Sequence, residues 1–230
     1  MDWLTDYYNW RIVSQYTGEF ARGLGNTLIA AGASLVLSVL AGVPLALLHM
    51  SRRAAVWRPV AAYVQFIRST PLLVQIYLVY YAVPMLIPGA GRWSEMILGI
   101  LAMTLHHAAY MSEIIRVGIE SVPRGQVEGA KACGMNYQQR LRYVVLPQAF
   151  ANTLPPLLGQ TAVLIKDTSL LSLITVFELV AAGVQMNSDR IVPSESFLTI
   201  AAGYLLIYGV MLLLSRGVSL WLAGPAWNAR

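Results

Sequence analysis

Charged residues are scarce in this chain. They make up 12% of its 230 residues, about half of the usual share, whereas hydrophobic residues make up 57%. A soluble surface needs more charge than this, and a disordered chain needs a lower hydrophobicity. The composition therefore excludes both classes of protein and favours an integral membrane protein.

Cysteine is almost absent, and two functional signals are missing. Cys133 is the only cysteine, so no internal disulfide is possible. No Gly-x-x-x-x-Gly-Lys-Ser/Thr loop is present to hold ATP phosphates. The first long apolar run follows acidic and aromatic residues, which is not the pattern of a signal peptide. Because the basic residues lie between apolar runs, the net charge of +5 indicates membrane topology, and we expect no nucleic-acid partner.

Long uncharged stretches are the main feature that is present. Five of them enclose 29, 23, 17, 23 and 20 residues, and a spanning helix needs roughly 17–25. We therefore predict an all-α polytopic membrane protein in which residues 1–230 form a single transmembrane domain. The five predicted transmembrane helices are residues 24–49, 64–84, 95–116, 144–165 and 197–218. The apolar segment from Thr168 to Phe177 is too short to span, so we expect a re-entrant or interfacial helix there.

The basic residues also predict the orientation of these helices. With the N-terminus outside, eleven of the 16 Lys and Arg residues lie on the inner side and five on the outer side. The positive-inside rule therefore favours an arrangement with the N-terminus outside and the C-terminus inside. In this arrangement the loop 117–143 faces the cytoplasm.

The loop 117–143 has the pattern of a compact helix-turn-helix. Gly134 is suited to a left-handed cap that ends a first helix, Gln126 to Cys133. Asn136 is suited to capping a second helix, Tyr137 to Tyr143. Such a structured inner loop suggests a docking surface for a soluble partner. The alternative is a loop that packs only on itself.

A long spaced motif lies in the same loop. Glu128-Gly129-Ala130 is followed after three residues by Gly134 and, after nine more, by Val144-Val145-Leu146-Pro147. This spacing resembles the EAA loop of ABC-importer permeases, with Gly129 in place of the usual alanine at a cost in helix propensity of up to ~1 kcal/mol. Residues 66–75, 109–116 and 164–171 further resemble the polar amino-acid branch of the family, the histidine, glutamine and arginine type.

The resemblance implies a membrane-spanning permease subunit of an ATP-driven importer in the bacterial inner membrane. Such a subunit moves a polar amino acid or related small zwitterion into the cytoplasm by alternating access. The implied partners are a second permease subunit, identical or paralogous, two cytoplasmic ATP-binding subunits and an outer solute-binding protein. The chain itself would not be an enzyme and would hold no cofactor and no metal, because its partner subunits would bind ATP and Mg²⁺.

Two groups of residues are candidates for coupling and gating. The residues expected to couple the chain to the ATPase are Glu128, Gly129, Ala130, Ala132, Gly134, Leu146 and Pro147. Small side chains at Ala130 and Ala132 would let the partner approach closely, and Gly134 would permit the turn. The hinge or gate candidates are Arg68, Thr70 and Pro71, at the start of the second predicted span. The alternative for these three is a helix cap with a snorkelling arginine.

Lys166-Asp167-Thr168-Ser169 is the main candidate for contact with the substrate. It lies where the fourth predicted span ends, and a broken helix there would offer free backbone groups. Ionisable groups at membrane depth usually serve a path or a partner. Asp167 would hold an α-ammonium group, while Thr168, Ser169 or helix-start amides hold an α-carboxylate. The alternative is an interface anchor formed by Lys166 and Asp167.

Four further residues are candidates for the substrate path: Glu178, His106, His107 and Gln75. Adjacent histidines lie about 100° apart on a helix and cannot both face one site, and packing explains each of them as well. Two other functions are also open, a secondary transporter or channel that is independent of an ATPase and a membrane-embedded enzyme. The structured inner loop argues against the first. The lack of paired carboxylates, a nucleophile set or metal-ligand spacing argues against the second.

Overall fold

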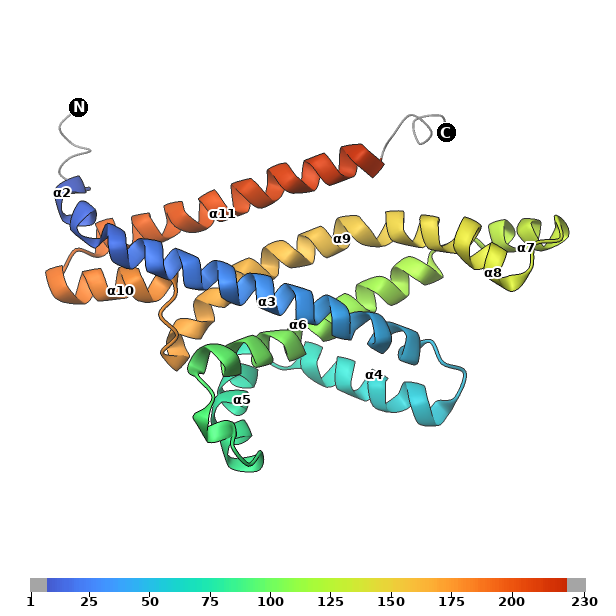
Figure 1. Ribbon diagram of the computed structural model, residues 1–230, viewed down its shortest axis with the longest axis horizontal. Coiled ribbons are helices and arrows are strands. Elements are labelled where there is room, and N and C mark those ends of the chain that lie inside the picture. Colours follow the sequence, from blue (N-terminus) through green and yellow to red (C-terminus); the bar gives the residue numbers. More distant parts are fainter. Residues whose placement is uncertain (1–7, 223–230) are drawn as a thin grey trace. The chain divides into compact units, whose positions relative to one another are not determined.

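The computed structural model describes residues 8–222 of the chain, and the side chains of residues 8–217. Within this part every regular element is a helix, which confirms the predicted all-α class (Figure 1). The α-helices are α2 (Trp10–Val13), α3 (Thr17–His49), α4 (Ala54–Ser69), α5 (Leu72–Leu86), α6 (Glu95–Glu120), α7 (Arg124–Ala132), α8 (Tyr137–Arg140), α9 (Leu146–Asp167), α10 (Leu179–Arg190) and α11 (Pro193–Leu222). Short 3₁₀ helices at Ser14–Tyr16, Ala90–Arg92 and Thr168–Ile174 and a π-helix at Leu141–Val145 complete the elements.

Several helical segments are long and apolar enough to cross a membrane. Three helical segments have the required length and hydropathy: Trp10–His49, Tyr137–Ile174 and Pro193–Gly217. The helices α4 and α5 together meet the same requirement as one broken span. The described chain is therefore a multi-pass membrane protein with three to four candidate spans. The 26-residue α6 is not among them, because two histidines and several charged residues lower its hydropathy. The count of five spans stays a prediction.

The second predicted span, 64–84, is wrong as a single helix. The helix α4 ends at Ser69, Thr70 is extended with φ −117° and ψ 145°, and α5 begins at Leu72. Proline disfavours a helical conformation in the residue before it, and the Thr70 hydroxyl caps α4 by donating to the Phe66 carbonyl at 2.9 Å. Thr70 therefore ends one helix, and Pro71 precedes the next instead of occupying its first turn.

The segment after α9 also differs from the prediction. Residues Thr168–Ile174 form a 3₁₀ helix that continues directly from α9, so the expected break with free backbone groups is absent there. The chain turns at Thr175, whose φ of 66° is left-handed. The helix α10 was not predicted, and its N-cap is Glu178, which the sequence suggested as a ligand. The Glu178 carboxylate accepts a hydrogen bond from the Ala181 amide at 3.0 Å.

Two compact groups of segments make up the described chain, and each has its own packing. The first comprises 8–35, 72–104 and 162–214, and the second comprises 36–71, 105–161 and the end of α11. The first is centred on an apolar cluster of Val13, Tyr16, Phe20, Leu179, Ala182, Met186 and Ile200. In the second, Val64 and Ile67 of α4 pack on Ala109 of α6. Since α3, α6 and α9 run through both groups, the single domain predicted for residues 1–230 stays a prediction.

Candidate functional site

The first helix of the loop 117–143 ends as its sequence predicts. Gly134 has φ 78° and lies in the left-handed region. Its amide donates to the Lys131 carbonyl at 2.9 Å, and the Met135 amide donates to the Ala130 carbonyl at 3.1 Å. This pair of hydrogen bonds is the Schellman motif, which closes the last turn of a helix. The direction in which the chain leaves α7 is therefore set by one glycine.

The second helix of the loop is capped from both sides. The Asn136 side chain accepts from the Gln139 amide at 3.0 Å, and the Gln139 side chain accepts from the Asn136 amide at 2.9 Å. The Arg140 guanidinium donates to the Met135 carbonyl at 2.7 Å, which ties α8 back to the turn. The two helices and the turn of the predicted helix-turn-helix are therefore present, but the second helix does not end at Tyr143 as predicted. Beyond α8 the chain runs without a break through the π-helix Leu141–Val145 into α9.

The coupling candidates differ in what they present to a partner. Most are exposed, namely Glu128, Gly129, Ala132, Gly134, Leu146 and Pro147. Ala130 is only 8% exposed and packs within the chain, so the close approach of a partner there stays a prediction. A Cβ atom at Gly129 would meet no atom within 4 Å, so the packing of the chain does not explain glycine there.

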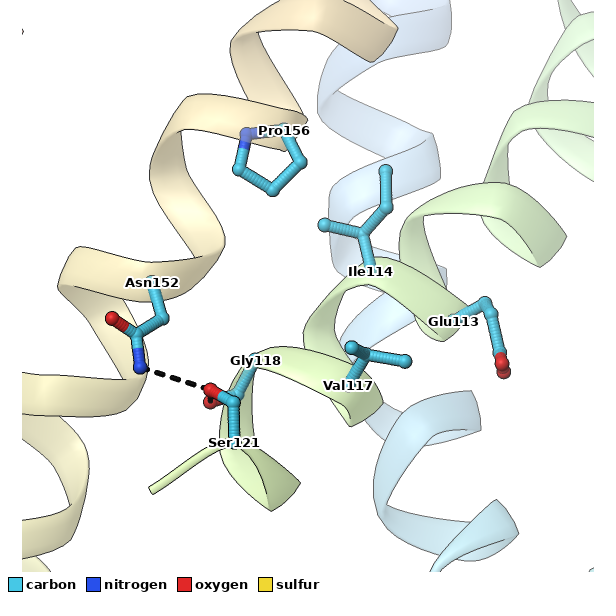
Figure 2. Close-up of a pocket in the computed structure, with 7 residues that line it drawn as sticks. All are labelled: Glu113, Ile114, Val117, Gly118, Ser121, Asn152 and Pro156. Atoms are coloured by element: carbon cyan, nitrogen blue, oxygen red, sulfur yellow. Dashed lines mark hydrogen bonds between the residues drawn. The ribbon is translucent and has the colours of Figure 1, made fainter. Parts of the chain in front are cut away.

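A cavity of about 490 Å³ lies between α6 and α9, close to the loop (Figure 2). Its lining residues are Glu113, Ile114, Val117, Gly118, Ser121, Asn152 and Pro156. The Glu113 carboxylate is already paired, because the Arg116 guanidinium binds it at 2.6 and 3.0 Å and binds Glu120 at 2.6 Å. The carboxylate also lies 3.9 Å from His49 Nδ1. The remainder of the lining is mainly apolar.

The two histidines of α6 are packed among other side chains. His107 is fully buried, and its Nδ1 lies 3.0 Å from Gln160 Nε2 of α9. The ring of His106 contacts that of Tyr110, with centroids 4.9 Å apart, and the Arg68 guanidinium lies over Tyr110 at 5.5 Å. These contacts favour a packing role for both histidines and give Arg68 a partner on α6.

The substrate candidates do not form one cluster of free polar groups. Asp167 is half-buried at the end of α9. Thr168 is fully buried, and its hydroxyl donates to the Ile165 carbonyl at 2.7 Å. Ser169 is half-buried, and its carbonyl accepts from Ser172 at 2.7 Å. Gln75 is buried in α5, at 6% exposure.

Glu178 has contacts typical of a structural residue. It is fully buried, one carboxylate oxygen caps α10, and the other accepts from the Tyr204 hydroxyl at 2.9 Å. The next amide, Leu179, donates to the Thr27 hydroxyl at 3.1 Å. The carboxylate thus joins α10 to α11 and is not exposed to a substrate.

Comparison with known proteins decides the family. Residues 34–223 match the family of the binding-protein-dependent transport system inner membrane component. The chain belongs to this family. The permease is 39% identical over 213 residues to the nopaline transport system permease protein NocM of Agrobacterium fabrum, covering 89% of this chain and 87% of that protein. It is 33% identical over 190 residues to the probable glutamine ABC transporter permease protein GlnM of Bacillus subtilis, covering 80% and 84%.

A solved structure has the same fold. The crystal structure of an amino acid ABC transporter with histidines matches the permease with a TM-score of 0.82 and 31% identity, over 90% of this chain and 95% of that chain. The family that the loop motif predicts is thereby confirmed. The permease is the membrane component of an ABC importer, and its partner subunits hydrolyse the ATP. Nothing in the comparisons favours a secondary transporter or channel.

Sequence reasoning missed most of the residues that join α6 to α9, since only His107 was among its candidates. Gly118 lies against Thr153. Ser121 forms a hydrogen bond with Asn152, and His107 forms one with Gln160. In the sequence these residues are more than 30 positions apart within each pair, so no local pattern connects them. The one signal was Gly118 itself, since a glycine inside a helix is costly unless a close contact requires it.

Proposed function

We propose that the permease carries a polar amino acid or a related small zwitterion across the membrane. The named substrates of its relatives, nopaline and glutamine, and the amino acid transporter structure support this substrate class. The observation that carries the proposal is the segment 124–147, in which α7, the capped turn and the helix that follows carry the EAA spacing from Glu128 to Pro147. A permease that worked alone would have no need of such a loop.

The proposed assembly contains a second permease subunit, two ATP-binding subunits and an outer solute-binding protein. The exposed residues of α7, with Glu128 and Ala132 among them, would seat on one ATP-binding subunit. When these subunits close on ATP, the two docked loops would move together, and the helices would switch the path from inward-facing to outward-facing. The element with two states is the pair of permease subunits, and ATP biases its equilibrium.

Within this proposal Asp167 is the substrate contact of first choice. It is half-buried at the junction of α9 and the 3₁₀ helix, in the segment 164–171 that resembles the polar amino-acid branch of the family. An α-ammonium group would pair with the Asp167 carboxylate. The neighbouring Ser169 is also half-buried and would supply a hydroxyl to the α-carboxylate.

Reconstitution tests the proposed function. Vesicles that contain the permease, its cognate ATP-binding subunit and internal ATP should take up radiolabelled amino acid only when loaded binding protein is added outside. Basic amino acids, glutamine and opines should be screened in turn. Uptake without the ATP-binding subunit, or no uptake of any of these solutes, would contradict the proposal.

The proposed topology has five spans, with the N-terminus outside and the loop 117–143 inside. We expect a membrane-impermeant thiol reagent on intact spheroplasts to label Gly89→Cys and not Gln126→Cys, both in a Cys133→Ser background. Gly89 precedes the 3₁₀ helix Ala90–Arg92, and Gln126 is exposed on α7, so both cysteines should be reactive once the reagent reaches them. Both should be labelled after permeabilisation. Labelling of Gln126→Cys in intact spheroplasts would rule out this orientation.

A further inference from the structure

The helices on either side of the loop 117–143 pack closely at a point where α6 carries no side chain. A Cβ atom on Gly118 of α6 would collide with the hydroxyl of Thr153 on α9 and would lie 3.3 Å from its Cα atom. Thr153 is itself fixed, because its hydroxyl donates to the Ala149 carbonyl at 2.6 Å. The missing side chain at Gly118 therefore lets the two backbones approach closely.

A hydrogen bond reinforces this contact on the side nearer the loop. The Asn152 amide donates to the Ser121 hydroxyl at 2.9 Å, as Figure 2 shows, and that hydroxyl donates to the Gly118 carbonyl at 2.8 Å. Ser121 lies directly after the end of α6, and Asn152 lies in the second turn of α9. The two contacts thus join the chain just before the loop to the chain just after it.

Few other side chains pack around the Gly118–Thr153 and Ser121–Asn152 contacts. The cavity of about 490 Å³ lies beside them and is lined by Gly118, Ser121 and Asn152 themselves (Figure 2). On that side no side chain of the described part of the chain fills the space between α6 and α9. On the loop side the π-helix Leu141–Val145 has wider, less regular turns than an α-helix, and such turns occur often at functional sites.

We propose that Gly118, Thr153, Ser121 and Asn152 form a latch that makes the inner ends of α6 and α9 move as one body. The proposal rests on the proposed function, because it assigns to these four positioning residues the transfer of loop motion into the membrane. If the two ends slid past each other, displacement of the loop would be absorbed between them. With the latch closed, the same displacement moves both helices, and ATP hydrolysis yields transport.

A pair of cysteines tests the latch both when it is open, in the reduced state, and when it is closed by a disulfide. The variant is Ser121→Cys with Asn152→Cys in a Cys133→Ser background, reconstituted with the ATP-binding subunit and binding protein. In the reduced state the hydrogen bond is lost, so uptake per ATP hydrolysed should fall by about 2- to 10-fold, the effect of one lost hydrogen bond. Oxidation should cross-link the pair and restore uptake per ATP towards the wild-type value.

Three results would overturn the latch. They are loss of uptake on cross-linking, wild-type coupling in the reduced variant, and failure of the pair to cross-link despite the 2.9 Å contact. The matched control is Thr161→Val on the same helix, which should leave uptake per ATP unchanged. It removes a hydroxyl whose hydrogen bond, among the described residues, is to the Leu157 carbonyl of α9. Absence of ATP-driven uptake in the Cys133→Ser parent would instead count against the proposed function and leave the latch contacts unaffected.

Discussion

Replacing Gly134 by valine should abolish the stimulation of ATP hydrolysis by loaded binding protein, while the permease still inserts in the membrane. Gly134 has φ 78°, and no atom lies within 4 Å of the position that a Cβ would occupy. Space is therefore not the obstacle. A branched residue in the left-handed region is strained by about 1–2 kcal/mol, and relief of that strain would break the hydrogen bonds that end α7.

The magnitude follows from the strain. About 1–2 kcal/mol corresponds to roughly 5- to 30-fold in the population of the native turn. In the conformers that leave α7 in another direction, the loop would no longer present its exposed face to the ATP-binding subunit. Co-purification of that subunit and its hydrolysis rate, with and without loaded binding protein, measure the effect.

Two control variants separate backbone strain from side-chain bulk. Gly134→Asn should retain most of the activity, because asparagine tolerates the left-handed region. Gly129→Ala should retain all of it, because an added Cβ there meets nothing within 4 Å and alanine favours the helix. Wild-type assembly and stimulation in Gly134→Val would remove the docking role of the loop.

Replacing Asp167 by asparagine should weaken the binding of substrate at the membrane site by roughly 10- to 150-fold. Asparagine keeps the shape and most of the hydrogen bonding of aspartate but removes the charge. A charge-assisted hydrogen bond to an ammonium group is worth about 1.5–3 kcal/mol, which converts to this range of affinity. Binding to the separate solute-binding protein should not change, and basal ATP hydrolysis should survive.

Uptake into reconstituted vesicles at subsaturating substrate measures this effect, with expression and basal hydrolysis measured alongside. Lys166→Gln tests the alternative of an interface anchor, since it should mimic Asp167→Asn only if the two residues pair. Glu178→Gln is the structural control, because it weakens a buried helix cap. It should lower the free energy of unfolding by about 1–3 kcal/mol without changing the affinity for substrate. Uptake within about twofold of wild type in Asp167→Asn would show that Asp167 is not a ligand.

Much of the permease could be predicted from its sequence alone, wherever the deciding interactions join residues that are close together in the chain. Scarce charge and long apolar runs predicted an integral membrane protein. Long apolar segments can cross a bilayer as helices, because a helix satisfies its own backbone hydrogen-bonding groups. The spacing from Glu128 to Pro147 determined the family. The conformation of Gly134 and the capping by Asn136 followed from the sequence because their hydrogen bonds join residues no more than five positions apart.

The break between α4 and α5 was only half predicted. Thr70 and Pro71 marked the place, yet the sequence did not show that a 16-residue helix precedes it. The reason is that α4 is not apolar all round. Val64 and Ile67 face Ala109, while Arg58 faces outwards, so the hydropathy that identifies spans does not identify this helix.

The tertiary structure alone showed which polar residues are engaged in packing between helices. Glu178 was suggested as a ligand, but folding brings Tyr204 of α11 to its carboxylate and makes it a buried cap. Gly118 had no role in the sequence analysis, but the fold places Thr153 against it. In each case the deciding contact joins residues more than 25 positions apart, and only the folded chain brings such partners together.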